Sequence, residues 1–353
     1  MNIVRTQFDR FTGWVTGSMH AGRSLSALRI LYGIAIVSFL FTNLADRHYL
    51  WGVASKWVDP EANRRAWFPL FDLVFTKDSA FAFDLAYGVL IVLALLFLVG
   101  WQTRFVTPVL LVFWVGLATN STVLTNGGDT ILRITLFFLI FANLSKHWSV
   151  DAWLTRRRGR ELRPILRGRL AIPGWFANAA NNTAVMLCAY QIMLVYVNSG
   201  IYKLMGPEWR EGTAFYYSVV LDVFRPFPAL NDLTWQFGAF VWVATFLSVW
   251  VQLLFPVLIL WRPTRILALA FTIMMHFGIG LFLGLWPFSL AMIALDLLFV
   301  RDRSWEAVGR WAKHAGGVLR QLLPERAPAG RTTETGPPAE TERPVTTTAG
   351  PAS

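Results

Sequence analysis

The stretch YVNSGIYKLMGPEWREG, from Tyr196 to Gly212, marks the point where a long apolar run gives way to a lysine, a Gly-Pro pair and a Trp-Arg-Glu-Gly turn. Lys203 stands at the end of this run, within two helical turns of Asn198. Because such a run predicts a membrane helix, the ammonium of Lys203 is expected at or just inside a bilayer interface. An ionisable group at that depth is a candidate functional residue. The competing interpretation is structural: the Lys203 side chain extends along the lipid so that its ammonium reaches water.

The composition of the whole chain is that of an integral membrane protein. Its 353 residues are 55% hydrophobic and include 17 Trp and 28 Phe, which is too apolar and aromatic for a soluble domain. The net charge of +11 comes from Lys and Arg residues beside the apolar runs. Membrane lipids with anionic head groups are therefore the expected partner, and nucleic acid is not.

Cysteine and histidine usage argues against a metal site. The single cysteine, Cys188, lies inside an apolar run, so the chain can form neither an internal disulfide nor a cysteine metal site. The five histidines show no paired spacing on one helix. No metal ligand set is therefore predicted.

Eight apolar runs predict an all-α fold, a polytopic membrane helical bundle. A helix needs roughly 20 residues to cross a hydrocarbon core of about 30 Å, and the fourth run is the marginal one. The predicted spans are residues 25–44, 80–100, 105–122, a fourth that ends near 144, 182–203, 236–261, 265–283 and 286–300.

Composition divides the chain into four parts. Residues 1–22 are amphipathic and are expected to form a short helix on the membrane surface. They precede a transmembrane domain over 23–305 and a basic amphipathic helix over 306–326. The Pro, Thr, Glu and Gly content of 327–353 predicts a disordered tail.

Charge distribution predicts the orientation. Lys and Arg are concentrated between Lys146 and Arg169, and the positive-inside rule then places both termini in the cytoplasm of a multi-pass protein of the cell membrane. Lys203 is expected at the outer face. There, the aromatic loops 46–79 and 204–235 are either ordinary interfacial belts or a lid over a hydrophobic ligand such as a quinone.

Ionisable side chains inside the spans are candidate site residues, because each is costly in hydrocarbon without a partner. Lys203 is the candidate base, since an amine in an apolar pocket gives up its proton more readily. His276 either bonds a ligand or relays a proton, or it is a core histidine bonded to a neighbouring helix. Asp129 and Arg133 stand four residues apart and are expected to neutralise one another, either beside a ligand or as a lock between spans.

Further polar residues are expected to join helices. Asn198, Gln191 and Gln252 are predicted interhelical hydrogen-bond partners, and Asp296 is predicted to pair with Arg29. The predicted ligand pocket around the catalytic candidate Lys203 consists of Asp129, Arg133, Asn198, His276 and Trp209.

Two blocks of sequence resemble the HTTM family, the horizontally transferred transmembrane domain. They are NGGDTILRITLFFLIFANLSKHWSVDAW, from Asn126 to Trp153, and YVNSGIYKLMGPEWREGTAF, from Tyr196 to Phe215. The second is similar to the family's Gly-x-x-Lys-Leu followed by Trp-x-x-Gly, and with the span pattern the resemblance covers about residues 20–305. For the vitamin K-dependent gamma-carboxylase branch, it implies a quinone or reduced vitamin K as cofactor and places Lys203 at the position of the base.

The resemblance leaves the activity open. The carboxylase branch has an Asn-Asn-His segment where this chain has Asn126 to Asp129 without a histidine, and no large lumenal domain is expected after the last span. Smaller, SdpB-like members imply the alternative of a non-catalytic membrane factor for maturation, export or immunity of a small secreted peptide. A transporter is a third alternative, for which no inverted repeat is visible.

Overall fold

The computed structural model describes residues 2–55, 71, 74–75, 79–158, 173–322 and 350. Secondary structure in these residues is helical throughout. The chain forms two units, Met1–Glu306 and Ala307–Ser353. The predicted tail over 327–353 lies outside the described residues apart from Gly350, as does most of the basic segment that leads to Arg169.

A helix of the first unit overlaps each of the eight predicted spans, although not all of these helices are long enough to cross a membrane. They are α2 (Gly22–Thr42), α6 (Ala80–Val99), α7 (Thr103–Thr119), α8 (Gly127–Leu139), α10 (Gly174–Met205), α14 (Gly238–Leu258), α15 (Arg262–Leu283) and α16 (Trp286–Asp296), the last continued by η3 (Leu297–Phe299).

Within the described residues, five of these helices are long and apolar enough to cross a membrane: α2, α6, α10, α14 and α15. The apolar helices α7 and α16 are shorter. The 13 residues of α8 are too few to cross a core of about 30 Å at 1.5 Å per residue. The chain is thus a membrane protein that combines helices of full length with shorter ones.

The connecting segments contain further short helices. They are α1 (Asn2–Gly17), α3 (Arg47–Leu50), η1 (Thr122–Leu124), α9 (Val150–Arg158), α11 (Pro207–Glu211), α12 (Ala214–Val220), η2 (Asp222–Phe224) and α13 (Pro228–Trp235), and α17 (Asp302–Leu322) follows the bundle. In α1, the side chains of Val4, Phe8 and Phe11 are exposed, as an interfacial helix requires.

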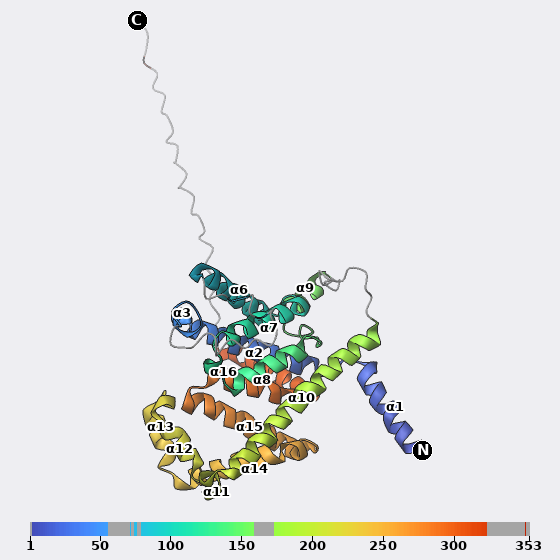
Figure 1. Ribbon diagram of the computed structural model, residues 1–353. Helices are drawn as coiled ribbons and strands as arrows, with labels where there is room; N and C mark the ends of the chain where they lie inside the picture. Colours follow the sequence, from blue (N-terminus) through green and yellow to red (C-terminus); the bar gives the residue numbers. More distant parts are fainter. Residues whose placement is uncertain are drawn as a thin grey trace. The chain divides into compact units, whose positions relative to one another are not determined.

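The long helix α10 packs against α8, α14 and α16, and against α1 near its own start (Figure 1). The helix begins at Gly174, eight residues before residue 182, where the span was predicted to start. Asn181 and Asn182 lie within the helix and do not interrupt it. The side-chain amide of Asn182 donates to the carbonyls of Val15 at 2.9 Å and Ser18 at 2.7 Å. These polar residues therefore attach α1 to α10.

Glycines allow two close helix contacts in the bundle. A Cβ at Gly33 would lie 2.7 Å from the Cα of Leu98, so α2 and α6 touch through their backbones there. A Cβ at Gly200 would lie 3.1 Å from the backbone nitrogen of Leu253, so α10 also lies close to the backbone of α14. Small residues have this role in many membrane bundles.

Arg29 of α2 is fully buried, and its partners are backbone carbonyls. Its guanidinium donates to Leu144 at 3.2 Å, Phe97 at 3.0 Å and Trp148 at 2.6 Å, and also to Leu98. The last carbonyls of a helix lack partners within it, and the guanidinium offers five donors. The predicted Arg29–Asp296 pair is therefore wrong.

We expect Arg29→Met to lower the free energy of unfolding by at least about 3 kcal/mol, because several buried carbonyls lose a charged donor. Chemical denaturation in detergent, followed by tryptophan fluorescence, measures this change. The matched control is Arg23→Met, which removes a partly exposed pair with Glu306 and should cost less than about 1 kcal/mol. Equal losses in the two variants would contradict the role assigned to Arg29.

Candidate functional site

The candidate site lies along one face of the last three turns of α10. Tyr196, Ser199 and Lys203 are spaced by three and four residues, so they share a face of the helix. The hydrogen-bond partners of that face come from α14, α15 and α16. Four helices thus contribute to a polar strip along this face of α10.

Lys203 is half-buried and is held by uncharged groups. Its Nζ donates to Oε1 of Gln252 at 2.8 Å and stands 4.6 Å from the centroid of the Trp209 ring. The hydroxyl of Ser199 donates to the same Gln252 oxygen at 3.2 Å. Among the residues with described positions, no carboxylate forms a salt bridge with Lys203.

The turn after α10 explains the position of Trp209. Gly206 ends α10 and Pro207 occupies the first position of α11, where its fixed φ favours a helix start. Gly212 closes α11 with φ 81°, a conformation that glycine adopts without strain. The short helix thus folds Trp209 back over Lys203, and the predicted neighbours are in contact.

His276 is fully buried and belongs to a three-residue cluster. Its Nε2 lies 3.1 Å from the hydroxyl of Tyr196, which donates to the two carboxylate oxygens of Asp296 at 3.0 and 2.9 Å. The prediction that His276 bonds a neighbouring helix is confirmed. Asp296 was identified from the sequence as a polar residue in an apolar helix but was assigned to Arg29. Tyr196 was missed, although the same signal could have found it.

Gln252 connects the two groups of residues. Besides Lys203, it reaches α15, where its Nε2 lies 3.7 Å from the Sδ of Met275, the residue before His276. The interhelical role predicted for Gln252 is confirmed. It is likewise confirmed for Gln191, which bonds Thr135 and the carbonyl of Ile131 in α8.

Asp129 and Arg133 lie at the start of α8. The Asp129 carboxylate accepts the backbone N–H of Asn126 at 2.9 Å, and the Asn126 side chain accepts N–H groups of the first turn, which together form a capping box. Arg133 donates to the carbonyl of Asp129 at 3.3 Å and to the hydroxyl of Thr130 at 3.2 Å. The predicted neutralising pair is thus replaced by a helix cap, because the free N–H groups there attract the carboxylate.

The other predicted pocket residues do not gather around Lys203. Asp129 lines a small pocket with Phe39, Trp51 and Trp114, and Lys203 is not among its lining residues. Asn198 is exposed, since it lies about 200° around the helix from Tyr196. Of the predicted set, only Trp209 directly contacts Lys203.

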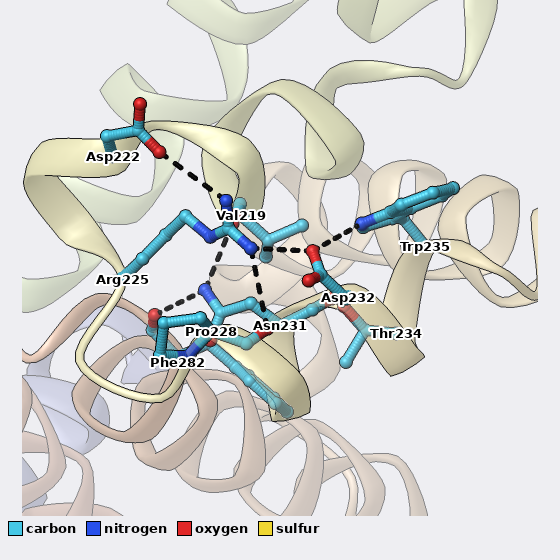
Figure 2. Close-up of polar contacts among 9 residues, drawn as sticks. All are labelled: Val219, Asp222, Arg225, Pro228, Asn231, Asp232, Thr234, Trp235 and Phe282. Carbon is cyan, nitrogen blue, oxygen red and sulfur yellow. Dashed lines mark hydrogen bonds and ion pairs between the residues drawn. The ribbon is translucent and has the colours of Figure 1, made fainter.

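The loop after Lys203 is a folded cap built from α12, η2 and α13 (Figure 2). Asn231 is fully buried, and its side-chain amide donates to the carbonyl of Val219 at 3.0 Å and to that of Phe282 at 2.9 Å. Those bonds join α12, α13 and the end of α15.

A charged cluster supports the same cap. Arg225 contacts the carboxylates of Asp232 at 2.6 Å and Asp222 at 3.4 Å, and the indole N–H of Trp235 donates to Asp232 at 3.2 Å (Figure 2). The aromatic loop is therefore held in one arrangement at the end of α15.

A family model described as HTTM domain matches residues 19–305. Comparisons with curated proteins and with solved structures give no match. The matched range includes every bundle helix, Lys203 with its partners, and the His276 cluster.

We expect Asn231→Ala to loosen the cap without unfolding the bundle. Loss of hydrogen bonds to buried carbonyls costs about 1–3 kcal/mol, so amide exchange over residues 214–235 should accelerate about tenfold to a hundredfold. Hydrogen-exchange mass spectrometry measures this. Asn198→Ala, which changes an exposed asparagine, should leave exchange unaltered, and unchanged exchange in Asn231→Ala would show that Asn231 does not hold the cap.

Proposed function

The chain belongs to the HTTM family, and we propose that it is a quinone-dependent membrane enzyme, carboxylase-like in its first step, in which Lys203 is the general base. One observation carries this proposal: the amine of Lys203 lies between an amide oxygen and an aromatic face, and no carboxylate in the described residues pairs with it.

The partners of Lys203 suit an amine that gains and loses a proton. When Lys203 is an ammonium, Oε1 of Gln252 accepts one of its hydrogens and the face of Trp209 stabilises its charge. A carboxylate would hold the proton through a salt bridge, whereas these neutral groups release it with less cost. The amine remains aimed at one place in both states because Gln252 is itself bonded to Ser199.

The surroundings of Lys203 fit a flat, lipid-soluble ligand. Tyr202 and Met205 beside it are 66% and 70% exposed, so this end of α10 presents apolar side chains where lipid would lie. A quinone has an aromatic ring that can stack on indole and oxygens that can bond an amine. When bound, a reduced quinone supplies a phenolic O–H and two electrons. Lys203 then takes the phenolic proton, Gln252 orients the amine, and Trp209 covers it from water.

We expect Lys203→Met to slow the oxidation of vitamin K hydroquinone by about 10²–10⁴-fold, the usual contribution of a general base. The rate is measured under air with the purified protein in lipid nanodiscs. Lys146→Met is the matched control, since Lys146 is exposed and lies between α8 and α9, and its rate should equal that of the wild type. Full activity in Lys203→Met would exclude the base role.

The variant Lys203→Arg shows whether the site needs a residue that transfers a proton or only a residue with a positive charge. Arginine keeps the positive charge and can still donate to Gln252, but it does not give up its proton. We therefore expect the same loss of rate as in Lys203→Met, together with a thermal melting curve like that of the wild type. Retained activity in Lys203→Arg would mean that the site needs only a cation.

A direct binding measurement tests the quinone itself. Lipid extraction and native mass spectrometry of the wild type should detect a bound quinone whose occupancy changes in Lys203→Met. A wild-type protein that neither retains a quinone nor accelerates hydroquinone oxidation would contradict the enzyme proposal and favour a factor for a small secreted peptide.

A further inference from the structure

The hydroxyl of Tyr196 lies between an acid and a base from two other helices. It donates to the carboxylate of Asp296 in α16 at 3.0 and 2.9 Å and lies 3.1 Å from Nε2 of His276 in α15. The relative exposures of Tyr196, His276 and Asp296 are 0%, 1% and 0%. These three residues, here called the buried triad, form a chain of hydrogen bonds inside the bundle.

The hydrogen bonds of the buried triad can run in two directions, because a tyrosine hydroxyl has one hydrogen to donate. If Tyr196 donates to an ionised Asp296, then Nε2–H of His276 donates to the Tyr196 oxygen, and Nδ1 carries a lone pair. If Asp296 is protonated, it donates to the Tyr196 oxygen, Tyr196 donates to Nε2, and the hydrogen of the imidazole is on Nδ1.

We propose that the buried triad is a proton relay that connects Nδ1 of His276 with Asp296. A proton from water forms the Nδ1–H bond, and the Nε2–H proton passes to the Tyr196 oxygen. The original hydroxyl proton of Tyr196 passes to Asp296. Three bonds form, namely Nδ1–H, a new Tyr196 O–H and Asp296 O–H. Three bonds break, namely one in the hydrated proton that enters, Nε2–H and the original Tyr196 O–H. The triad therefore gains one proton, and its charge changes from −1 to neutral.

The chain of hydrogen bonds in the buried triad ends at Nδ1 of His276. Nδ1 of His276 is buried and has no hydrogen-bond partner in the part of the chain that the structure describes. The His276 ring stacks on the Tyr196 ring with an interplanar angle of 17°. The Phe288 ring meets the His276 ring edge-on, with 5.6 Å between the ring centroids. A buried polar atom without a partner is costly, and a water molecule at Nδ1 would relieve that cost and serve as the proton donor.

The charged groups on the neighbouring helices have other partners or form no salt bridge with the buried triad. Arg29 is bonded to carbonyls, Arg23 to Glu306, and Lys203 to Gln252. In the described residues, none of the charged groups on the packed helices forms a salt bridge with Asp296 or His276: Arg23 and Arg29 on α2, Asp129 and Arg133 on α8, Lys203 on α10, and Arg262 and Arg265 on α15. Helix α14 and η3 carry no charged residue.

The absence of a counter-ion gives the relay its driving force. An ionised Asp296 without a cationic partner is unfavourable in an apolar bundle. Proton entry at Nδ1 removes that charge without creating an imidazolium. The relay stands apart from the base role proposed for Lys203, and it can be tested without any quinone.

The test combines two spectroscopic measurements on the full chain in lipid vesicles during a pH titration. Solid-state NMR with ¹⁵N-histidine reports which nitrogen of His276 carries the proton, and the His276 signal is the one lost in His276→Gln. Infrared difference spectra report the carbonyl stretch of protonated Asp296, which is absent in Asp296→Asn. We expect the imidazole hydrogen to move from Nε2 to Nδ1 at the same pH midpoint at which the Asp296 band appears.

Tyr196→Phe is the decisive variant, because it keeps the ring that contacts His276 and Phe255 and removes only the hydroxyl. We expect the two midpoints to separate in this variant, while Lys203→Met retains a shared midpoint. The proposal is overturned if Tyr196→Phe leaves the midpoints together, or if wild-type His276 becomes doubly protonated while Asp296 stays ionised. Should Asp296→Asn fail to fold, Tyr196→Phe alone decides.

Discussion

Water is scarce in the hydrocarbon core, so the buried polar groups of this bundle bond mainly to other groups of the protein. Arg29 illustrates the constraint: its guanidinium is satisfied by carbonyls at the end of α6 and beyond α8. Its bonds to Phe97 and Leu98 supply donors to carbonyls at the end of α6, where donors within the helix run out. Gly100, with φ 73°, ends α6 beside this guanidinium, where a Cβ would lie 2.7 Å from it. One cation thereby fixes three segments relative to one another.

Close helix contacts determine where such partners can meet. The missing side chain of Gly200 lets α14 approach α10, and the approach brings Gln252 within 2.8 Å of Lys203. Gln252 also reaches α15 through Met275. A side chain with both a donor and an acceptor can link helices in this way without introducing a charge. The polar strip on α10 therefore depends on tight backbone packing as much as on the polar residues themselves.

The two polar groups along α10 differ in their access and their electrostatics. Lys203 is half-buried at the end of the helix, beside exposed apolar side chains, and its partners are neutral. The buried triad contains an acid and a base in the interior, joined by a hydroxyl. A site that exchanges protons with a lipid-soluble ligand needs the first kind of environment, whereas a relay needs the second, in which a chain of hydrogen bonds replaces water.

The sequence by itself determined the helical membrane fold, the order of the spans, and the contact of Trp209 with Lys203. Apolar runs and the Gly-Pro turn are local signals, and local signals fix helix limits and short turns. Only the tertiary structure decided the partners of Arg29 and Asp296 and the exposure of Asn198. A partner depends on which helices pack together and on how each is rotated about its axis. Those quantities are set by side-chain packing across the whole bundle, which no single stretch of sequence contains.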